Sequence, residues 1–364
     1  MLYRIPAARI LIVRFRMIGD VLLDTPVARA LRQHYPQSHI AFCTEPTPAG
    51  VLEGNPDIDE ILLHPRPSTW SQELKFLRQI RRRRFDLVVD LMGNSRSAIL
   101  TYMSGARHRL AFARFPRSLC YTILVDHRHG MQVYTVIKRL LILEPLGIQT
   151  TNISLHMTIT QQDQEVVERF LGSQGIKPDD LLICIDPTSY VPTREWPGEK
   201  FSRLADLLSD RLGARVCLLW GPSEKEKVQA IAIAARTHPI LTPAWRLNQV
   251  AALLARADLF VGSSSAPSHI AVSQNTPTIH ILGASPSVNW VPPEPQHRAV
   301  LAGLSCQPCN ANHCGPPLNI ACLRELSVDT VFDAILASYS WVPKLQRFHQ
   351  HEWPGGDTGS RLEL

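Results

Sequence analysis

The stretch from Arg9 to Asp24 constrains the fold more than any other part of the chain. Its first half, Ile10–Phe15, is a run of apolar and β-branched residues too short for a typical helix, which predicts a fully buried strand of a parallel sheet. A basic, glycine-containing loop follows, and then apolar residues recur at helical spacing. Because the next proline is tolerated only in a first turn, we expect a short turn at Asp20–Asp24 and a helix with Thr25 as its cap. Ligands of open α/β sheets bind at the carboxyl ends of the strands, so Asp20 is a candidate active-site acid.

The same pattern of strand, loop and helix recurs along the chain. In the first half we expect strands at His39–Cys43, Glu60–Leu63, Phe85–Leu91, Arg109–Phe112 and Tyr121–Asp126, and helices at Ser68–Arg84 and Met131–Leu146. In the second half we expect strands at Leu181–Ile185, Arg215–Trp220, from Asp258 and at Thr278–Leu282, and helices at Gln161–Gly172, Phe201–Leu212, Val250–Ala257 and Val328–Tyr339. This alternation predicts an α/β protein with two doubly wound sheets.

The length and a break in this pattern predict two domains. A chain of 364 residues exceeds what one hydrophobic core usually supports, and Pro178-Asp179-Asp180 separates the two series of strands. We assign residues 1–160 to a first domain and 161–335 to a second, with a linker at about 161–180, a terminal helix and return segment at 336–350, and a tail at 351–364 that we expect to be disordered. No apolar run approaches the roughly 18 residues of a membrane helix, and the N-terminus has no signal-peptide core, so we expect a soluble, cytoplasmic protein.

Positive charge is concentrated in the first part of the chain. Residues 1–130 contain 18 Arg and one Lys against 11 acids, whereas residues 131–364 contain 19 basic and 21 acidic residues. The expected helix Ser68–Arg84 ends in arginines, which indicates either a solvated helix end or a basic patch that faces a membrane. Nucleic acid is an alternative partner of such a surface, but the chain has no recognisable binding module, so we expect none.

Five segments, taken together, resemble a known family. They are RFRMIGDVLLDTP at 14–26, FDLVVDLMGNSRS at 85–97, TREWP at 193–197, WGPSE at 220–224 and VGSSSAPSHIA at 261–271. In this order they are similar to glycosyltransferase family 9, the ADP-heptose:lipopolysaccharide heptosyltransferases. The chain has neither the glycine fingerprint of dinucleotide dehydrogenases nor a P-loop, which argues against those two classes.

The resemblance implies a GT-B fold, in which two Rossmann-like domains face each other across a cleft and a final helix returns to the first domain. It implies metal-independent, cofactor-free transfer of a heptose, with inversion, from the nucleotide-sugar donor ADP-heptose to the lipid-linked anionic saccharide of the lipopolysaccharide inner core. Asp20 matches the family's catalytic base. The predicted donor contacts are Thr188, Ser189, Arg194 (where relatives usually carry a lysine), Glu224, Ser264, Ser265, Ala266 and His269. The predicted acceptor contacts are Arg14, Arg16, Gly19, Asn94 and Arg96, and such an acceptor implies a protein peripheral to the anionic inner face of the cytoplasmic membrane.

One departure leaves the donor sugar open. Relatives usually read Asp-Ser-Gly or Asp-Thr-Gly in the donor loop, where this chain has Ser264-Ser265-Ala266. Another donor sugar, or a nucleotide-sugar-binding protein that has lost activity, is therefore an alternative. An esterase is a further alternative because the loop faintly resembles a nucleophile elbow, although no oxyanion loop and no triad partners are recognisable. Four cysteines have a spacing similar to that of zinc ligands: Cys306, Cys309, Cys314 and Cys322. Metal binding, disulfide pairing and free thiols are all open alternatives for them.

Overall fold

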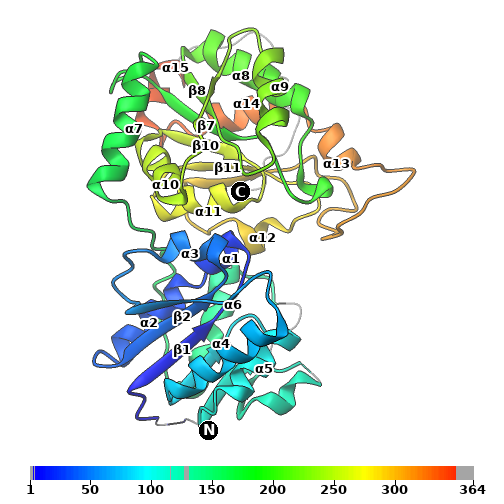
Figure 1. The fold of residues 1–364 in the computed structure, drawn as a ribbon. Helices are drawn as coiled ribbons and strands as arrows, with labels where there is room; N and C mark the ends of the chain where they lie inside the picture. Colours follow the sequence, from blue (N-terminus) through cyan, green and yellow to red (C-terminus); the bar gives the residue numbers. More distant parts are fainter. Residues whose placement is uncertain (1–2, 4, 115, 127–130, 350–364) are drawn as a thin grey trace.

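The computed structural model describes residue 3 and residues 5–114, 116–126 and 131–349, so the expected tail at 351–364 lies outside the described residues. It contains two parallel six-stranded sheets, one in each half of the chain (Figure 1). The first has the order β3-β2-β1-β4-β5-β6 and the second the order β12-β11-β10-β7-β8-β9. Within each sheet the first strand lies in the middle, and later strands are added on both sides of it. This is the doubly wound arrangement that the sequence predicts.

The strands are short and mostly buried. The first sheet is built from β1 (Arg9–Val13), β2 (His39–Thr44), β3 (Glu60–Leu63), β4 (Leu87–Asp90), β5 (His108–Phe112) and β6 (Ile123–Val125). The second is built from β7 (Leu182–Asp186), β8 (Arg215–Leu218), β9 (Ile240–Leu241), β10 (Leu259–Gly262), β11 (Thr278–Ile281) and β12 (His297–Val300). Central strands of a parallel sheet are covered on both faces, which explains why β1, β4, β7 and β10 are almost continuous apolar runs.

Helices and short 3₁₀ helices (η) connect these strands. In the first half they are α1 (Ile18–Leu22), α2 (Thr25–His34), α3 (Pro46–Ala49), η1 (Gly50–Leu52), α4 (Trp70–Arg82), α5 (Ser95–Met103), η2 (Arg117–Cys120), α6 (Thr135–Leu140) and η3 (Leu141–Leu146). In the second half they are α7 (Gln161–Ser173), η4 (Pro192–Arg194), α8 (Gly198–Leu212), α9 (Lys225–Ala234), α10 (Leu247–Arg256), α11 (Ala266–Ser273), α12 (Ser287–Trp290), α13 (Ala321–Arg324), α14 (Val328–Leu336), η5 (Pro343–Leu345) and α15 (Gln346–His349). No helix among the described residues is long and apolar enough to cross a membrane.

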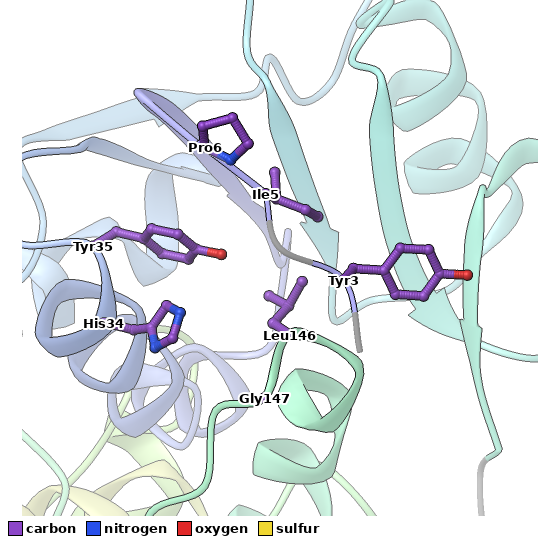
Figure 2. A pocket seen from close by; sticks show the side chains of 7 residues that line it. All are labelled: Tyr3, Ile5, Pro6, His34, Tyr35, Leu146 and Gly147. Carbon is purple, nitrogen blue, oxygen red and sulfur yellow. The ribbon is translucent and has the colours of Figure 1, made fainter. Parts of the chain in front are cut away.

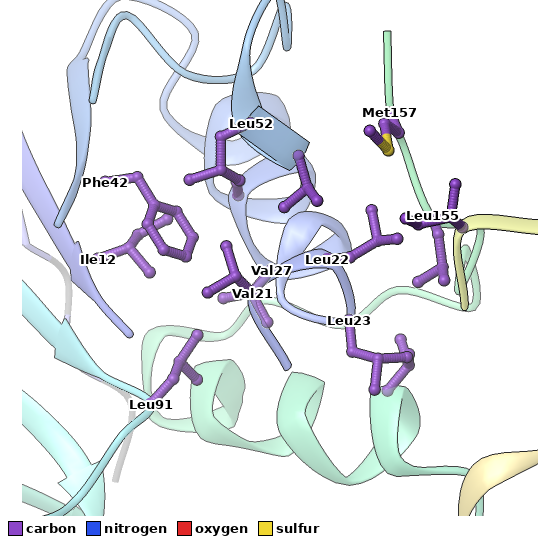
Figure 3. Close-up of a cluster of buried hydrophobic side chains, with 14 of the residues drawn as sticks. Ile12, Val21, Leu22, Leu23, Val27, Phe42, Leu52, Leu91, Leu155 and Met157 are labelled. Atoms are coloured by element: carbon purple, nitrogen blue, oxygen red, sulfur yellow. The ribbon is translucent and has the colours of Figure 1, made fainter. Parts of the chain in front are cut away.

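Strand β1 divides the core of the first half into two layers. Successive side chains of a strand point to opposite faces, so Ile10 and Ile12 pack with α1, α2 and α6, whereas Leu11 and Val13 pack with α4 and α5. Figure 3 shows the first layer, in which side chains of α1 and the start of α2 meet those of β1 and β2. The packing of α1 against β1 fixes the loop between them, which carries the candidate acid.

Three expectations about helix starts and ends are wrong in detail. Residues Ile18–Leu22 form the helix α1 where we expected a short turn at Asp20–Asp24, and Thr25 is the first residue of α2 instead of its cap. Asp24 occupies the cap position but makes no side-chain capping bond, because arginines bind its carboxylate. The expected helix Met131–Leu146 begins only at Thr135 and continues as a 3₁₀ helix from Leu141. This last segment contains Pro145, which lacks the backbone N–H that an α-helix needs.

The sequence also missed several elements of the second half. Helix α9 buries only Val228 and Ile231, and strand β12 begins with two polar residues, so neither carries a strong apolar period. The segment expected to return to the first domain packs instead on the second. Lys344 donates to the carbonyl oxygens of Pro178 (3.1 Å) and Asp180 (2.7 Å). Leu345 is buried in the core around the second sheet.

Candidate active site

All predicted site residues except Glu224, which follows β8, come after four particular strands. In each sheet the strand order changes direction beside the first strand, between β1 and β4 and between β7 and β10. Ligands of doubly wound sheets bind in the crevice at such switch points, outside the carboxyl ends of the strands. The loops and helix starts after these four strands, from residues 14, 91, 187 and 263 onward, carry these residues.

The two switch points face each other. Figure 1 shows α1 and α3 at the edge of the first half that faces the second, with α11 and α12 opposite them. Helix α1 packs against α11 so closely that a Cβ atom on Gly19 would lie 2.9 Å from Cδ2 of His269. Glycine is therefore required at residue 19 for this approach, which brings Asp20 of the first half beside the donor loop of the second.

Asp20 is held by an arginine that the sequence did not suggest. Arg139 of α6 pairs with the Asp20 carboxylate and also donates to the Asp20 backbone oxygen at 2.6 Å. Burial by itself would raise the pKa of Asp20, but the positive charges of Arg139 and Arg14 and the hydrogen bond from Arg139 outweigh it. The pKa therefore lies below its ordinary value, and the carboxylate is ionised at neutral pH. Its side chain keeps 29% exposure, so the carboxylate can be reached from the space between the domains.

Arg139 belongs to a buried charge network of two acids and two arginines. The carboxylate of Asp24 has no exposure and accepts from Arg139 Nη1 at 2.9 Å and from Arg14 Nε at 2.6 Å. Arg14, which we expected to hold the acceptor, is thus engaged inside the protein. Arg16 is exposed. Since Arg139 is 119 residues from Asp20, no local pattern of the sequence could have indicated their pairing.

The loop after β4 is shaped by its own hydrogen bonds. Asn94 caps α5, because its side-chain oxygen accepts from the Ser97 N–H at 2.9 Å. Buried Asp90 accepts from the backbone N–H groups of Met92 and Gly93, both at 2.9 Å, and holds the start of the loop. Arg96 is exposed at 43% and lies 3.9 Å from Glu45, which also accepts from Arg66. Of the two predicted acceptor residues here, Arg96 is available to a ligand, whereas Asn94 has a capping role.

The donor loops meet around a buried acid that the prediction omitted. Asp186 ends β7, and its carboxylate accepts from the Thr188 hydroxyl at 3.1 Å and from the Ser265 hydroxyl. Burial raises the pKa of Asp186 to about 7, although these hydrogen bonds lower it. Ser265 precedes α11, which begins at Ala266, and Ser264 is half-buried beside them. The rule of the carboxyl end, applied to β7, would have found Asp186.

The other predicted donor residues line the same edge of the second sheet. Arg194 ends η4, and its Nε atom is buried without a hydrogen-bond partner among the described residues. Glu224 accepts from the Gly221 N–H at 2.7 Å, so one of its oxygens is occupied. The backbone N–H of Ser189 donates to Glu195 at 3.1 Å. A buried guanidinium N–H without a partner is costly, and an anionic ligand is the kind of group that would satisfy it.

His269 is neutral and faces the first domain. Burial lowers the pKa of its imidazole to about 4, an effect that the nearby Asp20 charge partly opposes. Its Nδ1 atom has no hydrogen-bond partner among the described residues, and its ring lies 6.1 Å from that of Trp290. His269 therefore fills the contact between α1 and α11 as an uncharged ring that retains an unused polar atom.

Two of the cavities lined by described residues bear on these predictions. One of about 520 Å³ is lined by Tyr3, Ile5, His34 and Tyr35, among others, at the amino end of β1 (Figure 2). It therefore lies at the end of the sheet opposite the candidate acid. A second, of about 100 Å³, is lined by residues that include the four clustered cysteines and His313. All eight cysteines are unpaired, and within the described parts of the chain no three His, Cys, Asp or Glu residues are placed to hold a metal ion.

Comparisons with known proteins identify the family. A family model described as glycosyltransferase family 9 (heptosyltransferase) matches residues 73–317. The chain is also 31% identical, over 291 residues, to lipopolysaccharide heptosyltransferase 3 of Escherichia coli strain K12, which covers 76% of this chain and 83% of that protein. The chain belongs to glycosyltransferase family 9. It is therefore a glycosyltransferase, and the family expected from the five sequence segments is confirmed.

Solved structures confirm the fold. A family 9 glycosyltransferase from Veillonella parvula superposes with a TM-score of 0.80 at 25% identity, over 91% of this chain and 97% of that one. The ADP-heptose lipopolysaccharide heptosyltransferase II of E. coli superposes with a TM-score of 0.76 at 17% identity, over 93% of this chain and 99% of that one. The GT-B prediction, two Rossmann-like domains that face each other, is thus correct.

Proposed function

We propose that this glycosyltransferase transfers a heptose from ADP-heptose to the inner core of lipopolysaccharide, with inversion at the anomeric carbon. The curated relatives from E. coli and Haemophilus influenzae are lipopolysaccharide heptosyltransferases, at 31% and 23% identity. An E. coli heptosyltransferase with the same fold, 22% identical, was solved with ADP-2-deoxy-2-fluoro heptose. At this identity the structure shows only that the fold is shared. ADP-heptose as the donor of this chain is part of the proposal.

The observation that carries the proposal is the position of Asp20. Its ionised carboxylate lies where the first domain meets the donor loop, and Arg139 fixes its orientation. In the proposed step, an acceptor hydroxyl attacks the anomeric carbon while Asp20 takes its proton, and the bond from that carbon to the diphosphate breaks. A base within hydrogen-bond reach of the attacking hydroxyl typically contributes about 100-fold to 10,000-fold to the rate.

The second domain would stabilise the leaving diphosphate. Negative charge grows on the phosphate as the sugar departs, and a preorganised cation beside it lowers the barrier. The unpartnered Nε atom of Arg194 makes it the candidate for this role. We propose that Glu224 and Thr188 contact the nucleotide part of the donor, and that Ser264, Ser265 and Ala266 line the sugar.

The pairing of Asp186 with Ser265 bears on the identity of the sugar. Relatives usually supply an acid from the donor loop itself, whereas this chain brings one to the loop from β7. This departure in the donor loop favours a transferase with another donor sugar as the second candidate. An inactive nucleotide-sugar-binding protein would keep the donor site, but the arrangement of Asp20 and Arg139 opposes it.

A ligand screen tests the proposal. The melting temperature of the purified protein should rise with ADP-heptose by more than with UDP- or GDP-sugars, because a ligand at 100 times its dissociation constant adds about 2.7 kcal/mol to the free energy of unfolding. Arg194→Ala should reduce this rise. Transfer to a lipopolysaccharide precursor that lacks the terminal heptose then measures activity. A rise with UDP-sugars alone would replace the proposed donor, and donor binding without transfer to any inner-core acceptor would support the inactive binding protein.

A further inference from the structure

The segment from residue 64 to 125 presents an unusual surface. It contains twelve Arg or Lys against three acids. Each of the three acids already has partners. Glu73 pairs with buried His64 at 3.0 Å, Asp86 accepts from the backbone N–H groups of Ala8 and Arg9, and Asp90 is buried. The outward charge of this segment is therefore almost entirely positive.

Helix α4 exposes apolar and basic residues along one face. Phe76 and Ile80 are buried against the sheet, while the opposite face carries Trp70 (87% exposed) and Leu74 (47% exposed). Between and beyond them on that face lie Lys75, Arg78 and Arg82, which form no salt bridge among the described residues. An exposed tryptophan above a row of cations is typical of helices that lie in a membrane interface.

The exposed apolar residues continue onto the neighbouring elements. Helix α5 packs beside α4 and exposes Ile99, Tyr102 and Met103, and η2 packs beside α5 and exposes Leu119 at 79%. Arg81 joins the two helices by donating to the Met103 carbonyl oxygen at 3.4 Å. Single exposed apolar residues are ordinary, but six on three adjacent elements mark an interaction surface.

We propose that this surface, formed by α4, α5 and η2, docks on an anionic phospholipid bilayer. The combination of tryptophan, tyrosine and aliphatic side chains with arginines matches both parts of such a bilayer, its apolar boundary and its negative headgroups. A nucleic acid would use the positive charge but not the exposed aliphatic side chains. The proposal deepens the proposed function and rests on it only for the identity of the lipid-linked acceptor.

Docking in this way has a consequence for the acceptor. Helices α4 and α5 both begin at the carboxyl edge of the first sheet and run away from it, so the surface reaches Asn94, which caps α5, and Arg96 in the first turn of α5. With these helices on the bilayer, the space between the domains opens sideways at the level of the headgroups. A saccharide anchored in the same leaflet then reaches Asp20 without leaving the membrane surface.

Co-sedimentation with lipid vesicles tests the proposal on the full chain without any substrate. We expect binding to phosphatidylglycerol vesicles, release of most of the bound protein by high salt, and little binding to phosphatidylcholine vesicles. Each arginine or lysine near an anionic surface strengthens binding about fivefold, so the triple variant Lys75→Gln, Arg78→Gln, Arg82→Gln should bind about 100-fold more weakly. Trp70→Ala should weaken the binding that remains at high salt, because that part depends on apolar contact.

Matched controls remove the same groups from the second domain. Arg169, Lys177 and Arg203 are also exposed, and their replacement by glutamine removes the same charge. Ile233→Ala, on α9 and 70% exposed, is the control for Trp70→Ala. If the control triple variant loses as much vesicle binding as the α4 triple variant, binding depends only on net charge, and α4, α5 and η2 do not form a docking surface. Binding of the wild type to polyanions but not to phosphatidylglycerol vesicles would overturn the proposal in favour of nucleic acid. Because the vesicle experiment contains neither donor nor acceptor and the transfer assay contains no phosphatidylglycerol vesicles, failure of one proposal leaves the other intact.

Discussion

Replacement of Asp20 by asparagine tests the centre of the proposed mechanism. Asparagine keeps the shape of the side chain and accepts a hydrogen bond from Arg139, but it cannot take the acceptor proton. The rate of the chemical step should therefore fall by about 100-fold to 10,000-fold, which corresponds to about 2.7–5.4 kcal/mol of activation free energy. Donor affinity should barely change, since the predicted donor contacts lie in the second domain.

The structure predicts a small effect of the same change on stability. The Asp20 side chain is 29% exposed, so solvent screens its pair with Arg139, and losing that pair should cost about 1 kcal/mol of unfolding free energy or less. Arg139 keeps its bond to Asp24 at 2.9 Å and is not left without an acid. A purely structural role for Asp20 would therefore give a variant with slightly lower stability and nearly normal turnover.

Asp24→Asn is the matched control, because both carboxylates bind the same arginine. Asp24 has no exposure and receives bonds from Arg14 and Arg139, so removal of its charge leaves buried cations undercompensated. We expect a loss of about 3–5 kcal/mol of unfolding free energy. The chemical rate per folded molecule should fall less than tenfold, because Asp20 and its pair with Arg139 remain.

Three measurements on the two variants decide between these roles. Single-turnover rates at saturating donor report the chemical step, donor titrations report affinity, and urea unfolding reports stability. Near-normal single-turnover rates in Asp20→Asn would remove Asp20 as the base. Equal rate losses in both variants would instead show that the charge network acts as one scaffold, with no separate catalytic carboxylate.

Further expected outcomes concern the donor side and the contact between domains. Arg194→Ala should raise the donor KM and lower kcat about 100-fold in steady-state assays, while Arg194→Lys is milder; unchanged kinetics of the alanine variant would exclude the diphosphate contact. Because the pKa of Asp186 is raised to about 7, the folded protein keeps a proton that the unfolded chain loses near pH 4. The contribution of Asp186 to the free energy of unfolding is therefore present at low pH and decreases as the pH rises to 7. In Asp186→Asn, the decrease in the free energy of unfolding between pH 4 and 7 should be smaller by up to about 4 kcal/mol. Urea unfolding of both proteins across this pH range measures the difference. Parallel pH profiles of the two proteins would contradict the prediction. Gly19→Ala would place a methyl group against His269, so it should lower turnover and cost about 1–3 kcal/mol of stability by urea unfolding. An alanine variant with wild-type values would show that the domains separate easily.

The sequence predicted what depends on local patterns. Strand β1 and the other central strands of the two sheets are short apolar runs typical of buried parallel strands, and their alternation with amphipathic helices predicts the doubly wound order. The carboxyl-end rule then places Asp20, Arg194 and Ser265 near a ligand without any knowledge of contacts. The prediction for Thr25 was wrong because of a tertiary contact. Arginines bind the carboxylate of Asp24, which would otherwise cap α2.

Contacts between distant residues could not be predicted in the same way. Arg139 lies in an expected helix, and nothing in its neighbourhood distinguishes it from a solvated cation at a helix end. The approach of Gly19 to His269 depends on how the two domains pack, which neither domain's sequence specifies alone. These are the contacts that orient the proposed base, so the sequence indicated the candidate acid but not the group that holds it.

The donor loop shows that the residues of one loop do not by themselves define the groups around a ligand, because neighbouring strands also contribute side chains. Residues 264–266 lack the acid that relatives usually carry, which suggested that the loop had lost a contact to the sugar. In the structure a carboxylate reaches the loop from the adjacent strand, because β7 and β10 are neighbours and Asp186 pairs in register with Gly262. The Ser265 hydroxyl has one hydrogen and donates it to Asp186, so its oxygen can offer a ligand only lone pairs. A sugar hydroxyl that meets Ser265 must therefore donate, as it would to a carboxylate, so the loop keeps its acceptor character although none of its own residues is an acid.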